Sequence, residues 1–412
     1  MIPRGSTGAV TTMPDYDIII LGAGLSGLSL ACHLVGSSWR DRTILLVDKV
    51  VKERDDRTWC YWGSTPTLFD AAVFRTWDRL RVAGAGFERA LDLGDYRYRM
   101  IRGADFYRHA RALLAAHDNV AFAQGVIEHV DDGPGGARVI IDGRAVSATW
   151  VFDSRFQPAE LRDDEARYHT LKLHFKGWEI ETPEPAFDPG MPTFFDFRTP
   201  QAGEVRFFYL LPLTERRALV EYTLFAPRVL PRRDYEDALR QYLQSTLGVS
   251  SFHVLREEGG VIPATDRPFP RRAGEHVMNI GTRGGRVKPS TGYAFMRVQQ
   301  DSAAIVASLA RHGHPFDVPA GPHRYRLYDS ILLDIMCRHG GQIGPIFTAM
   351  FARNPTKRVL RFLDEVGPVW ENLLLIATLP PRLFLESIGR AVGRVPAAAG
   401  PGGSAVRRSS HV

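Results

Sequence analysis

The sequence predicts an α/β protein with a Rossmann-like βαβ domain, an antiparallel-sheet domain and a group of C-terminal helices. A glycine-rich turn at 22–27 lies between an apolar strand and a helix, residues 165–255 are rich in strand-forming and aromatic residues, and residues 324–392 follow a helical pattern. With 412 residues, of which 44% are hydrophobic, the chain is long enough for a large core divided between two lobes.

The N-terminal elements form the βαβ unit. Tyr16–Leu21 is a short apolar run bounded by glycine, which is typical of a buried parallel strand. A helix is expected from about Leu25 to Val35 and a second strand at Thr43–Val47. Further strands are expected at 120–122, 126–130, 137–141, 147–152, 170–175, 193–197, 205–211 and 218–225. Further helices are expected at 106–116, from after 292 to about 311, and at 325–337, 345–353, 357–365 and 370–392, the last interrupted at 380–381.

The turn Gly22-Ala23-Gly24-Leu25-Ser26-Gly27 has the GxGxxG pattern. Its glycines allow a tight turn and a close approach of the backbone to a pyrophosphate, which the helix N-terminus stabilises. Asp48 ends the next strand, where a carboxylate accepts hydrogen bonds from a ribose diol. The alternative is an ordinary βα turn. We expect the first half of a dinucleotide site at Gly22, Gly24, Leu25, Ser26, Gly27, Asp48 and Lys49.

A second glycine-rich segment lies far downstream, at Asn279–Thr282 and Lys288–Tyr293. It reads as a short strand and a turn that lead into a helix, whose N-terminus favours negative charge on a flavin ring near N1 and O2. The alternative is a plain junction between a loop and a helix. A site assembled from both ends of the chain favours FAD over NAD, with further contacts from Asp153, Gly281, Lys288, Pro289, Ser290, Thr291, Gly292 and Tyr293.

The middle section contains a carboxylate in an apolar strand. Residues 207–213 and 219–223 read as a hairpin, and strand alternation places Glu221 on the face of Leu219 and Thr223, opposite Val220 and Tyr222. If that face is covered, burial raises the pKa of the carboxyl group, which can then act as an acid or a base. The alternative is an exposed glutamate on a half-buried strand.

These segments together resemble the flavin-dependent lycopene cyclases of bacteria and plants. The resemblance covers roughly residues 15–310 and rests on ordered motifs, at Gly22–Gly27, Asp56–Trp62, Phe187-Asp188, Thr193–Arg198, Phe208–Leu213, Glu221–Thr223, Glu257-Glu258, Val261–Pro263 and Pro289–Tyr293.

The resemblance implies a two-domain FAD-binding flavoprotein that acts as a lycopene β-cyclase, an isomerase. Lycopene or a related acyclic carotene is the expected substrate, its ψ end groups are closed to β-ionone rings, and γ-carotene or β-carotene is the product. Reduced FAD is required in the family, with NADPH as the external reductant. Glu221 matches the catalytic glutamate and Asp196 an assisting acid.

The chain departs from many relatives at two positions. Tyr222 stands where a second acid is frequent, and Lys288 stands where a histidine is frequent. Tyr222 puts a pair of adjacent carboxylates at 221 and 222 in doubt, and Lys288 would add positive charge near the flavin.

The rival interpretation is a redox enzyme on the same fold, a flavin monooxygenase or a polyprenyl reductase. A flavin-binding module without catalysis is a further alternative.

The chain divides into four predicted regions and two tails. These are an FAD-binding domain at 15–164, a substrate domain at 165–255, a returning part of the FAD-binding domain at 256–323, a helical region at 324–393, and disordered tails at 1–14 and 394–412. Residues 60–100 belong either to the first domain or to the substrate lobe.

Charge and composition indicate which kinds of partner the protein is expected to bind. The net charge is +6, mostly from arginine, which fits either a compositional bias or a basic face on an anionic membrane. No basic stretch has the pattern of a nucleic-acid site, and the 3 cysteines and scattered histidines predict no metal site. We expect a cytoplasmic protein without a signal peptide or a membrane span, held peripherally on the inner face of the membrane. Leu373–Ile376, near Trp370 and Arg382, is either that contact or a core helix.

Overall fold

The computed structural model describes residues 14–161 and 167–394. The two segments predicted to be disordered, 1–14 and 394–412, lie outside the described residues except for Pro14 and Arg394. The described residues form two large sheets and a small one, with helices on their faces.

The first large sheet contains the predicted βαβ unit. Its parallel strands run in the order β8 (Val120–Gln124), β2 (Ile44–Asp48), β1 (Tyr16–Leu21), β11 (Arg144–Asp153) and β17 (Val277–Asn279). From β11 the sheet continues as an antiparallel meander through β10 (Gly136–Ile141) and β9 (Ile127–Gly133). The late strand β17 therefore joins the N-terminal strands, as the return of the chain to this domain requires.

Both faces of β1 are buried, which explains its unbroken apolar sequence. Ile18 and Ile20 pack against three helices, whereas Ile19 and Leu21 pack against strands of the same domain. The three helices are α1 (Leu25–Val35), α2 (Gly103–Leu114) and α4 (Phe295–His312). Since β1 leads directly into α1, the N-terminus of α1 lies at the carboxyl edge of the parallel strands, where ligands bind in such sheets.

The second large sheet is antiparallel except for one parallel pair. Its order is β16 (His253–Thr265), β12 (Thr170–Glu181), β15 (Arg217–Ala226), β14 (Val205–Pro212), β13 (Thr193–Asp196), β5 (Arg79–Gly84) and β6 (Phe87–Asp92), with β13 and β5 parallel. Residues 79–92 thus pair with strands of the substrate lobe. Strand β16 runs across the predicted domain boundary at 255 and keeps residues up to Thr265 in this sheet.

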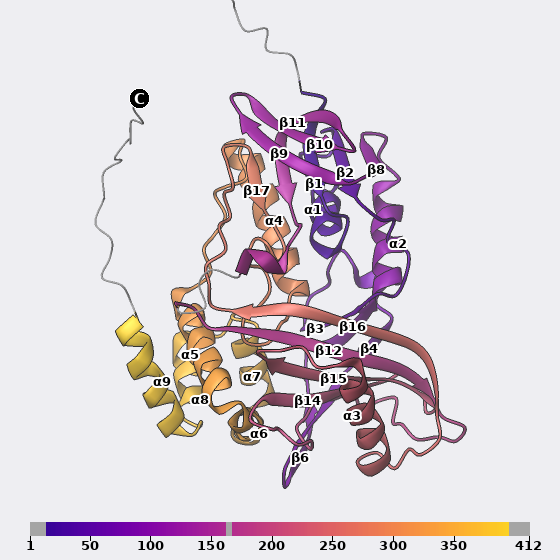
Figure 1. The fold of residues 1–412 in the computed structure, drawn as a ribbon, viewed down its shortest axis with the longest axis vertical. Helices are drawn as coiled ribbons and strands as arrows, with labels where there is room; N and C mark the ends of the chain where they lie inside the picture. The colour runs from indigo at the N-terminus through magenta and orange to yellow at the C-terminus, as the bar shows by residue number, and fades with distance from the viewer. Residues whose placement is uncertain (1–13, 162–166, 395–412) are drawn as a thin grey trace, which may run out of the picture.

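Helices cover both faces of the second sheet. On one face lies α3 (Arg232–Ser245). Part of the other face packs against C-terminal helices, namely α5 (His323–His339), α6 (Ile343–Arg353), α7 (Thr356–Leu363), α8 (Val369–Ile376) and α9 (Pro381–Arg394). In Figure 1 the first sheet with α1, α2 and α4 lies above the long strands of the second sheet, and the C-terminal helices gather at one end of those strands.

The small sheet lies in a segment that the sequence left unassigned. It consists of β3 (Thr58–Gly63), β7 (Arg97–Arg102) and β4 (Arg75–Trp77). Helix α3 and strand β16 were also absent from the predicted elements. Short 3₁₀ helices lie at Asp70–Ala72, Pro158–Leu161 and Gly340–Gln342. The elements that were predicted are confirmed in type, and helix α1 also in both of its ends.

Asp334 on α5 joins the C-terminal helices to the second sheet. Its carboxylate accepts hydrogen bonds from Arg390 on α9 at 2.7 Å and from Arg338 at 3.1 Å, and it lies 3.2 Å from Nε2 of His169, just before β12. Nδ1 of His169 lies 2.7 Å from Asp266. Burial opposes the ionisation of Asp334, but the hydrogen bonds from the two arginines outweigh it and lower its pKa to about 2.

We expect Asp334→Asn to lower the free energy of unfolding at pH 7 by about 2 kcal/mol, the low end for a broken buried pair because both arginines are partly exposed. The ionised Asp334 stabilises the fold above its unfolded pKa of about 3.8, and this stabilisation is lost as the pH falls toward 2. Urea unfolding should therefore show a constant difference from pH 7 to about pH 4 and a smaller one below. Asp237→Asn, at an exposed ion pair with Arg240, should change little; equal losses in the two variants would contradict the assignment.

Candidate active site

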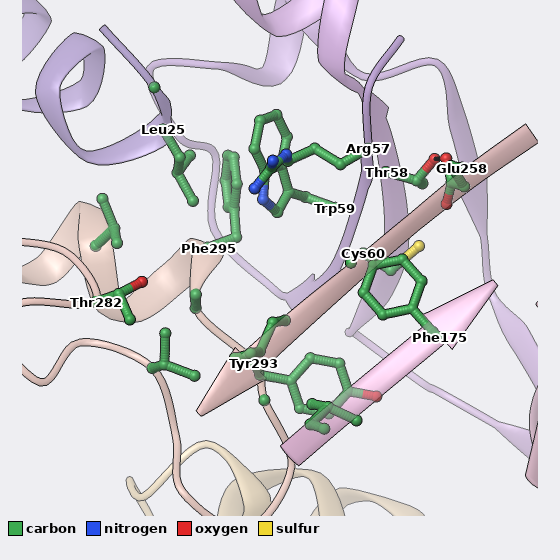
Figure 2. Close-up of a pocket in the computed structure, with 18 of the residues that line it drawn as sticks. Leu25, Arg57, Thr58, Trp59, Cys60, Phe175, Glu258, Thr282, Tyr293 and Phe295 are labelled. Carbon is green, nitrogen blue, oxygen red and sulfur yellow. Dashed lines mark hydrogen bonds between the residues drawn. The ribbon is translucent and has the colours of Figure 1, made fainter. Parts of the chain in front are cut away.

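A cavity of about 370 Å³ lies between the two large sheets. Its lining comes from the turn before α1, the segment before α4, the strands β12, β14, β15 and β16, and the start of β3. Figure 2 shows Leu25 and Thr282 of the first domain on one side of this space, and Phe175 and Glu258 of the second sheet on the other. The turns predicted to bind a dinucleotide and the strand predicted to carry an acid therefore share one chamber.

The turn before α1 has the geometry that the sequence predicts. Gly22 has a φ of +96°, which favours glycine, and a Cβ on Gly27 would lie 1.9 Å from the carbonyl oxygen of Gly22. Gly24, Leu25 and Ser26 line the cavity. No described side chain caps α1, and its first turn contains no acidic residue. Its N–H groups and the positive end of the helix dipole are therefore available to an anion.

Asp48 lies at the end of β2, beside the turn. One of its carboxylate oxygens accepts the N–H of Ala23 at 2.8 Å and the other accepts the N–H of Val50 at 3.2 Å. Asp48 thus holds the glycine-rich turn as well as standing where a ribose is expected. Lys49 is exposed and is not part of the cavity lining.

The late segment reaches the same cavity. Gly281, Thr291, Gly292 and Tyr293 line it, and Gly281 and Gly292 have φ values of +61° and +78°. A Cβ on Gly281 would lie 2.4 Å from Oγ of Ser26, so glycine allows the two halves of the predicted site to touch. The structure thus brings these predicted residues together with the turn before α1.

Lys288 points away from the cavity. Its Nζ donates to Asp329 at 2.9 Å and to Glu365 at 2.6 Å, and the hydroxyl of Ser290 also donates to Asp329. Pro289 is not part of the cavity lining. The prediction that Lys288 adds positive charge beside the flavin is therefore corrected: two carboxylates balance its charge, and it supports the loop from behind.

Asp153 ends β11 next to Gly22 but is also turned away. Its carboxylate accepts hydrogen bonds from Arg155 at 2.9 Å and from Arg283 at 2.9 Å. The following residue, Ser154, donates its hydroxyl to the carbonyl of Leu21 at 2.7 Å and lines the cavity. Ser154, rather than the predicted Asp153, is thus the residue of this turn that faces the chamber.

Strand β15 presents Glu221 to the cavity. Leu219, Glu221 and Thr223 line it, whereas Val220 and Tyr222 pack against α3 on the opposite face. This confirms the alternation expected from the sequence. Oγ1 of Thr223 donates a hydrogen bond of 2.8 Å to Oε1 of Glu221.

A second glutamate faces the cavity from β16. Gly177 on the intervening strand β12 pairs with Glu221 on one side and with Glu258 on the other. A Cβ on Gly177 would lie 3.1 Å from Cγ of Glu258 and 3.5 Å from Cβ of Glu221. Because glycine has no side chain there, the two glutamates occupy the space above it together.

Glu258 accepts hydrogen bonds from a guanidinium and a hydroxyl group, whereas Glu221 accepts one from a hydroxyl group. Its Oε2 accepts the hydroxyl of Thr58 at 2.8 Å and the guanidinium of Arg256 at 2.8 Å, and Figure 2 shows Thr58 beside it. Its Oε1 is buried and accepts no hydrogen bond of normal geometry from any described residue. The carboxyl of Glu221 lies close enough to couple to its titration.

Burial and mutual repulsion set the protonation of this pair. Burial raises the pKa of Glu221 well above its usual value, and the charge of Glu258 raises it further. Burial also raises the pKa of Glu258, but Arg256 and Thr58 oppose that shift. In the pH range where the pair holds a single proton, that proton therefore resides mainly on Glu221.

Aromatic and apolar side chains form the remaining walls. Of the aromatic residues between 178 and 222, Tyr209 lines the cavity, and its hydroxyl lies 3.0 Å from that of Tyr293. The other aromatic lining residues are Trp59, Tyr98, Tyr107, Phe175 and Phe295. Apolar walls with π-electron density thus lie beside the carboxyl pair.

Asp196 does not reach the chamber. It is fully buried, and its carboxylate accepts hydrogen bonds from Arg198 at 2.7 Å and from the hydroxyl of Tyr242 on α3 at 2.7 Å. The prediction that Asp196 assists Glu221 is therefore corrected. Asp196 fixes α3 and the end of β13, and Glu258 is the carboxylate that accompanies Glu221.

Sequence reasoning missed three basic residues and the second acid. Lys52, Arg57 and Arg286 line the cavity, and burial lowers the pKa of Arg286 to about 10. Alternation along β16 would have separated Glu258 from Glu257, which pairs with Lys176 at 2.7 Å on the other face. That signal was unusable because β16 itself was not predicted.

Comparison with solved structures identifies the class of fold. A flavin-dependent brominase, Bmp2, superposes with a TM-score of 0.61 at 15% sequence identity, over 92% of this chain and 99% of that one. A geranylgeranyl bacteriochlorophyll reductase-like protein from Thermoplasma acidophilum has a TM-score of 0.59 at 14% identity, over 91% and 98%. The protein therefore has the two-domain flavoprotein fold that the sequence predicts.

The sequence itself defines the family. The model of the lycopene cyclase protein family matches residues 17–388, and the chain belongs to that family. It is 26% identical to the lycopene beta-cyclase of Pantoea ananas, over 68% of this chain and 72% of that protein. It is 25% identical to the chloroplastic neoxanthin synthase of Solanum tuberosum, over 72% and 60%.

Proposed function

We propose that the protein is an FAD-dependent lycopene β-cyclase. It converts the ψ end groups of lycopene into β-ionone rings and yields γ-carotene, β-carotene or both, without net oxidation or reduction. The observation that carries the proposal is a pair of neighbouring carboxyls, Glu258 buried and Glu221 half-buried, in a chamber with apolar walls that is continuous with a dinucleotide-type turn. Family membership and the similarity to lycopene beta-cyclases support it.

The residues present fit FAD. The uncapped N-terminus of α1 suits a pyrophosphate, Asp48 suits a ribose, and the segment from Thr291 to Phe295 lies where a flavin ring would end against α4. Arg57, labelled in Figure 2 among the residues that line the cavity, adds a cation to the same space. When bound and reduced, FAD supplies an electron-rich ring beside a cationic substrate, and we propose NADPH as its external reductant.

The chain's own residues account for the acid chemistry. Burial and the charge of Glu258 disfavour the ionisation of Glu221 and raise its pKa, so its protonated carboxyl group can donate a proton to the terminal double bond. Thr223 orients its carboxyl group by the bond to Oε1. The apolar walls, including Leu211 and Leu219, exclude the water that would capture a carbocation. Ring closure is then an attack by a neighbouring double bond of the same substrate.

A hydrocarbon substrate also requires contact with the bilayer, and we propose α8 and α9 as that contact. Trp370 and Leu373 are 59% and 57% exposed, and further exposed apolar side chains are those of Val369, Leu374, Leu385 and Ile388. Arg382 lies among them and can meet anionic lipid. No helix among residues 14–161 and 167–394 is long and apolar enough to cross a membrane. The contact is therefore proposed as peripheral, on the cytoplasmic side.

Gly24→Asp should reduce FAD binding at least about tenfold, which is about 1.4 kcal/mol. A Cβ at Gly24 meets only Cε of Lys52, at 4.0 Å, so the fold is preserved, but the new carboxylate occupies the anion site at α1. The measurement is flavin absorbance per mole of purified protein, followed by titration with FAD. Gly133→Asp, in open space on β9, is the matched control and should keep its flavin. Full flavin content in Gly24→Asp would refute the assignment of this turn.

Glu221→Gln should retain FAD and lose ring closure by about 100-fold or more, because the amide cannot donate the proton. The measurement is pigment analysis in a lycopene-accumulating bacterium. Glu215→Gln, on the exposed turn of the same hairpin, should form cyclic carotene normally. Unchanged lycopene with the unmodified, flavin-loaded protein would contradict a cyclase, and carotenes with added oxygen or hydrogen would favour a monooxygenase or a reductase.

Trp370→Ser combined with Leu373→Ser should weaken binding to vesicles of phosphatidylglycerol and phosphatidylcholine by about tenfold or more, since each buried side chain contributes roughly 1.5–3 kcal/mol. Co-sedimentation at several vesicle concentrations gives the change. Val254→Ser with Leu255→Ser, also exposed but on β16, should bind as the unmodified protein does. Equal effects of the two double variants would remove α8 from the contact.

A further inference from the structure

Ring closure on an end group involves two proton transfers at two different carbons. One proton must be added to the terminal double bond, and after closure one must be lost from a ring carbon. A single carboxyl group held in a β-strand cannot easily reach both positions. Two glutamates whose strands lie about 10 Å apart, and whose side chains meet over the strand between them, can present carboxyl oxygens to both positions.

Glu258 meets the requirements for the group that accepts the second proton. It lines the cavity, and only 6% of the residue is exposed. Arg256 and Thr58 both donate to Oε2, which favours the ionised form, whereas Oε1 lacks a normal hydrogen bond from any residue in the described ranges. While Glu221 holds its proton, its carboxyl group is a hydrogen-bond partner of Glu258, but once that proton has moved to the substrate, Oε1 is a buried, ionised oxygen that is unfavourable unless a ligand supplies a donor. A carbocation and its acidic C–H group would do so.

We propose that Glu258 is a second catalytic residue, the base that removes the proton lost on ring closure, with Glu221 as the acid. The inference rests on the proposed cyclase function. Glu221 begins protonated and Glu258 ionised. Glu221 transfers its proton to the terminal alkene carbon, ring closure moves the positive charge to a ring carbon, and Glu258 takes one proton from the neighbouring carbon. The electrons of that C–H bond form the ring double bond.

The space over Gly177 allows the proton to return from Glu258 to Glu221 after the reaction. After the reaction Glu258 holds the proton and Glu221 is ionised, which is the less stable of the two arrangements because Arg256 favours the charge on Glu258. Since no side chain at Gly177 separates the two glutamates, the proton returns to Glu221 within the dry chamber. The pair then carries one proton again, and no solvent proton has been used.

The surroundings of the pair predict its pH dependence. The charged and titratable groups around it are Arg256 on β16, Glu179 on β12, which pairs with Arg256, Cys60 on β3, Tyr98 on β7 and Tyr209 on β14. Burial raises the pKa of the Cys60 thiol and of both tyrosines, so these groups stay neutral while the glutamates titrate. Activity should therefore follow the singly protonated pair and give a bell-shaped profile of kcat.

The test compares Glu258→Gln with Glu257→Gln in flavin-loaded protein with lycopene in vesicles. Glu258→Gln should lower kcat by about 100-fold or more, lose the acidic limb of the pH profile and keep the alkaline limb, which belongs to Glu221. Its residual products should include rings with the double bond at another position, or hydroxylated rings. Glu257→Gln, whose carboxylate pairs with Lys176 on the other face, should keep kcat, the bell shape and the products. Glu258→Asp should recover both limbs and part of kcat.

The outcomes distinguish a failure of the proposed function from a failure of the role assigned to Glu258. If the unmodified protein closes no ring, the proposed function fails, and the assignment of Glu258 as its base fails with it. If it does, and Glu258→Gln keeps more than half of kcat with both limbs and a single product, the role of Glu258 is overturned. Should Glu258→Gln not fold, as judged by flavin content and thermal unfolding, Glu258→Asp decides: an unchanged pH profile, kcat and product ratio overturn the proposal.

Discussion

The structure depends at its centre on two carboxyl groups that share one cavity. Neither Glu221 nor Glu258 could be buried there as an isolated ion, because the cost of desolvating a charge is large. Arg256 and Thr58 hold the charge at Glu258, and the proton on Glu221 removes the second charge. A buried group whose two forms lie close in energy can give up and regain a proton, which is what an acid–base site needs.

The fold places this pair where it can act. The second sheet supplies the carboxyls from β15 and β16, and the first sheet supplies the turn before α1 and the segment before α4 on the facing side. Family membership and the flavoprotein fold agree with the proposed roles of the two domains. One domain would bind the dinucleotide and the other the apolar substrate. Because function depends on the site and not on the fold, the proposed cyclase activity rests on the carboxyl pair and on family membership, and not on the architecture.

Several residues predicted to belong to the site lie outside the cavity lining and hold neighbouring segments in place. Lys288, Asp153 and Asp196 are all held by partners from distant segments: Glu365 pairs with Lys288, Arg283 pairs with Asp153, and the hydroxyl of Tyr242 donates a hydrogen bond to Asp196. The sequence does not show whether a charged side chain next to a binding motif points into the cavity or away from it, because that depends on its ion-pair partners. Its role is therefore decided by long-range ion pairing, which motif spacing does not report.

The sequence by itself determined the βαβ unit, the glycine-rich turns, the cavity-facing side of Glu221 and the type of most elements, because these follow from local periodicity and from backbone conformations that favour glycine. Only the tertiary structure decided that β16 lies beside β12 and that Glu258 meets Glu221 across Gly177. Strand pairing over such separations depends on which surfaces pack together, and no local pattern in residues 253–265 encodes the neighbouring strand.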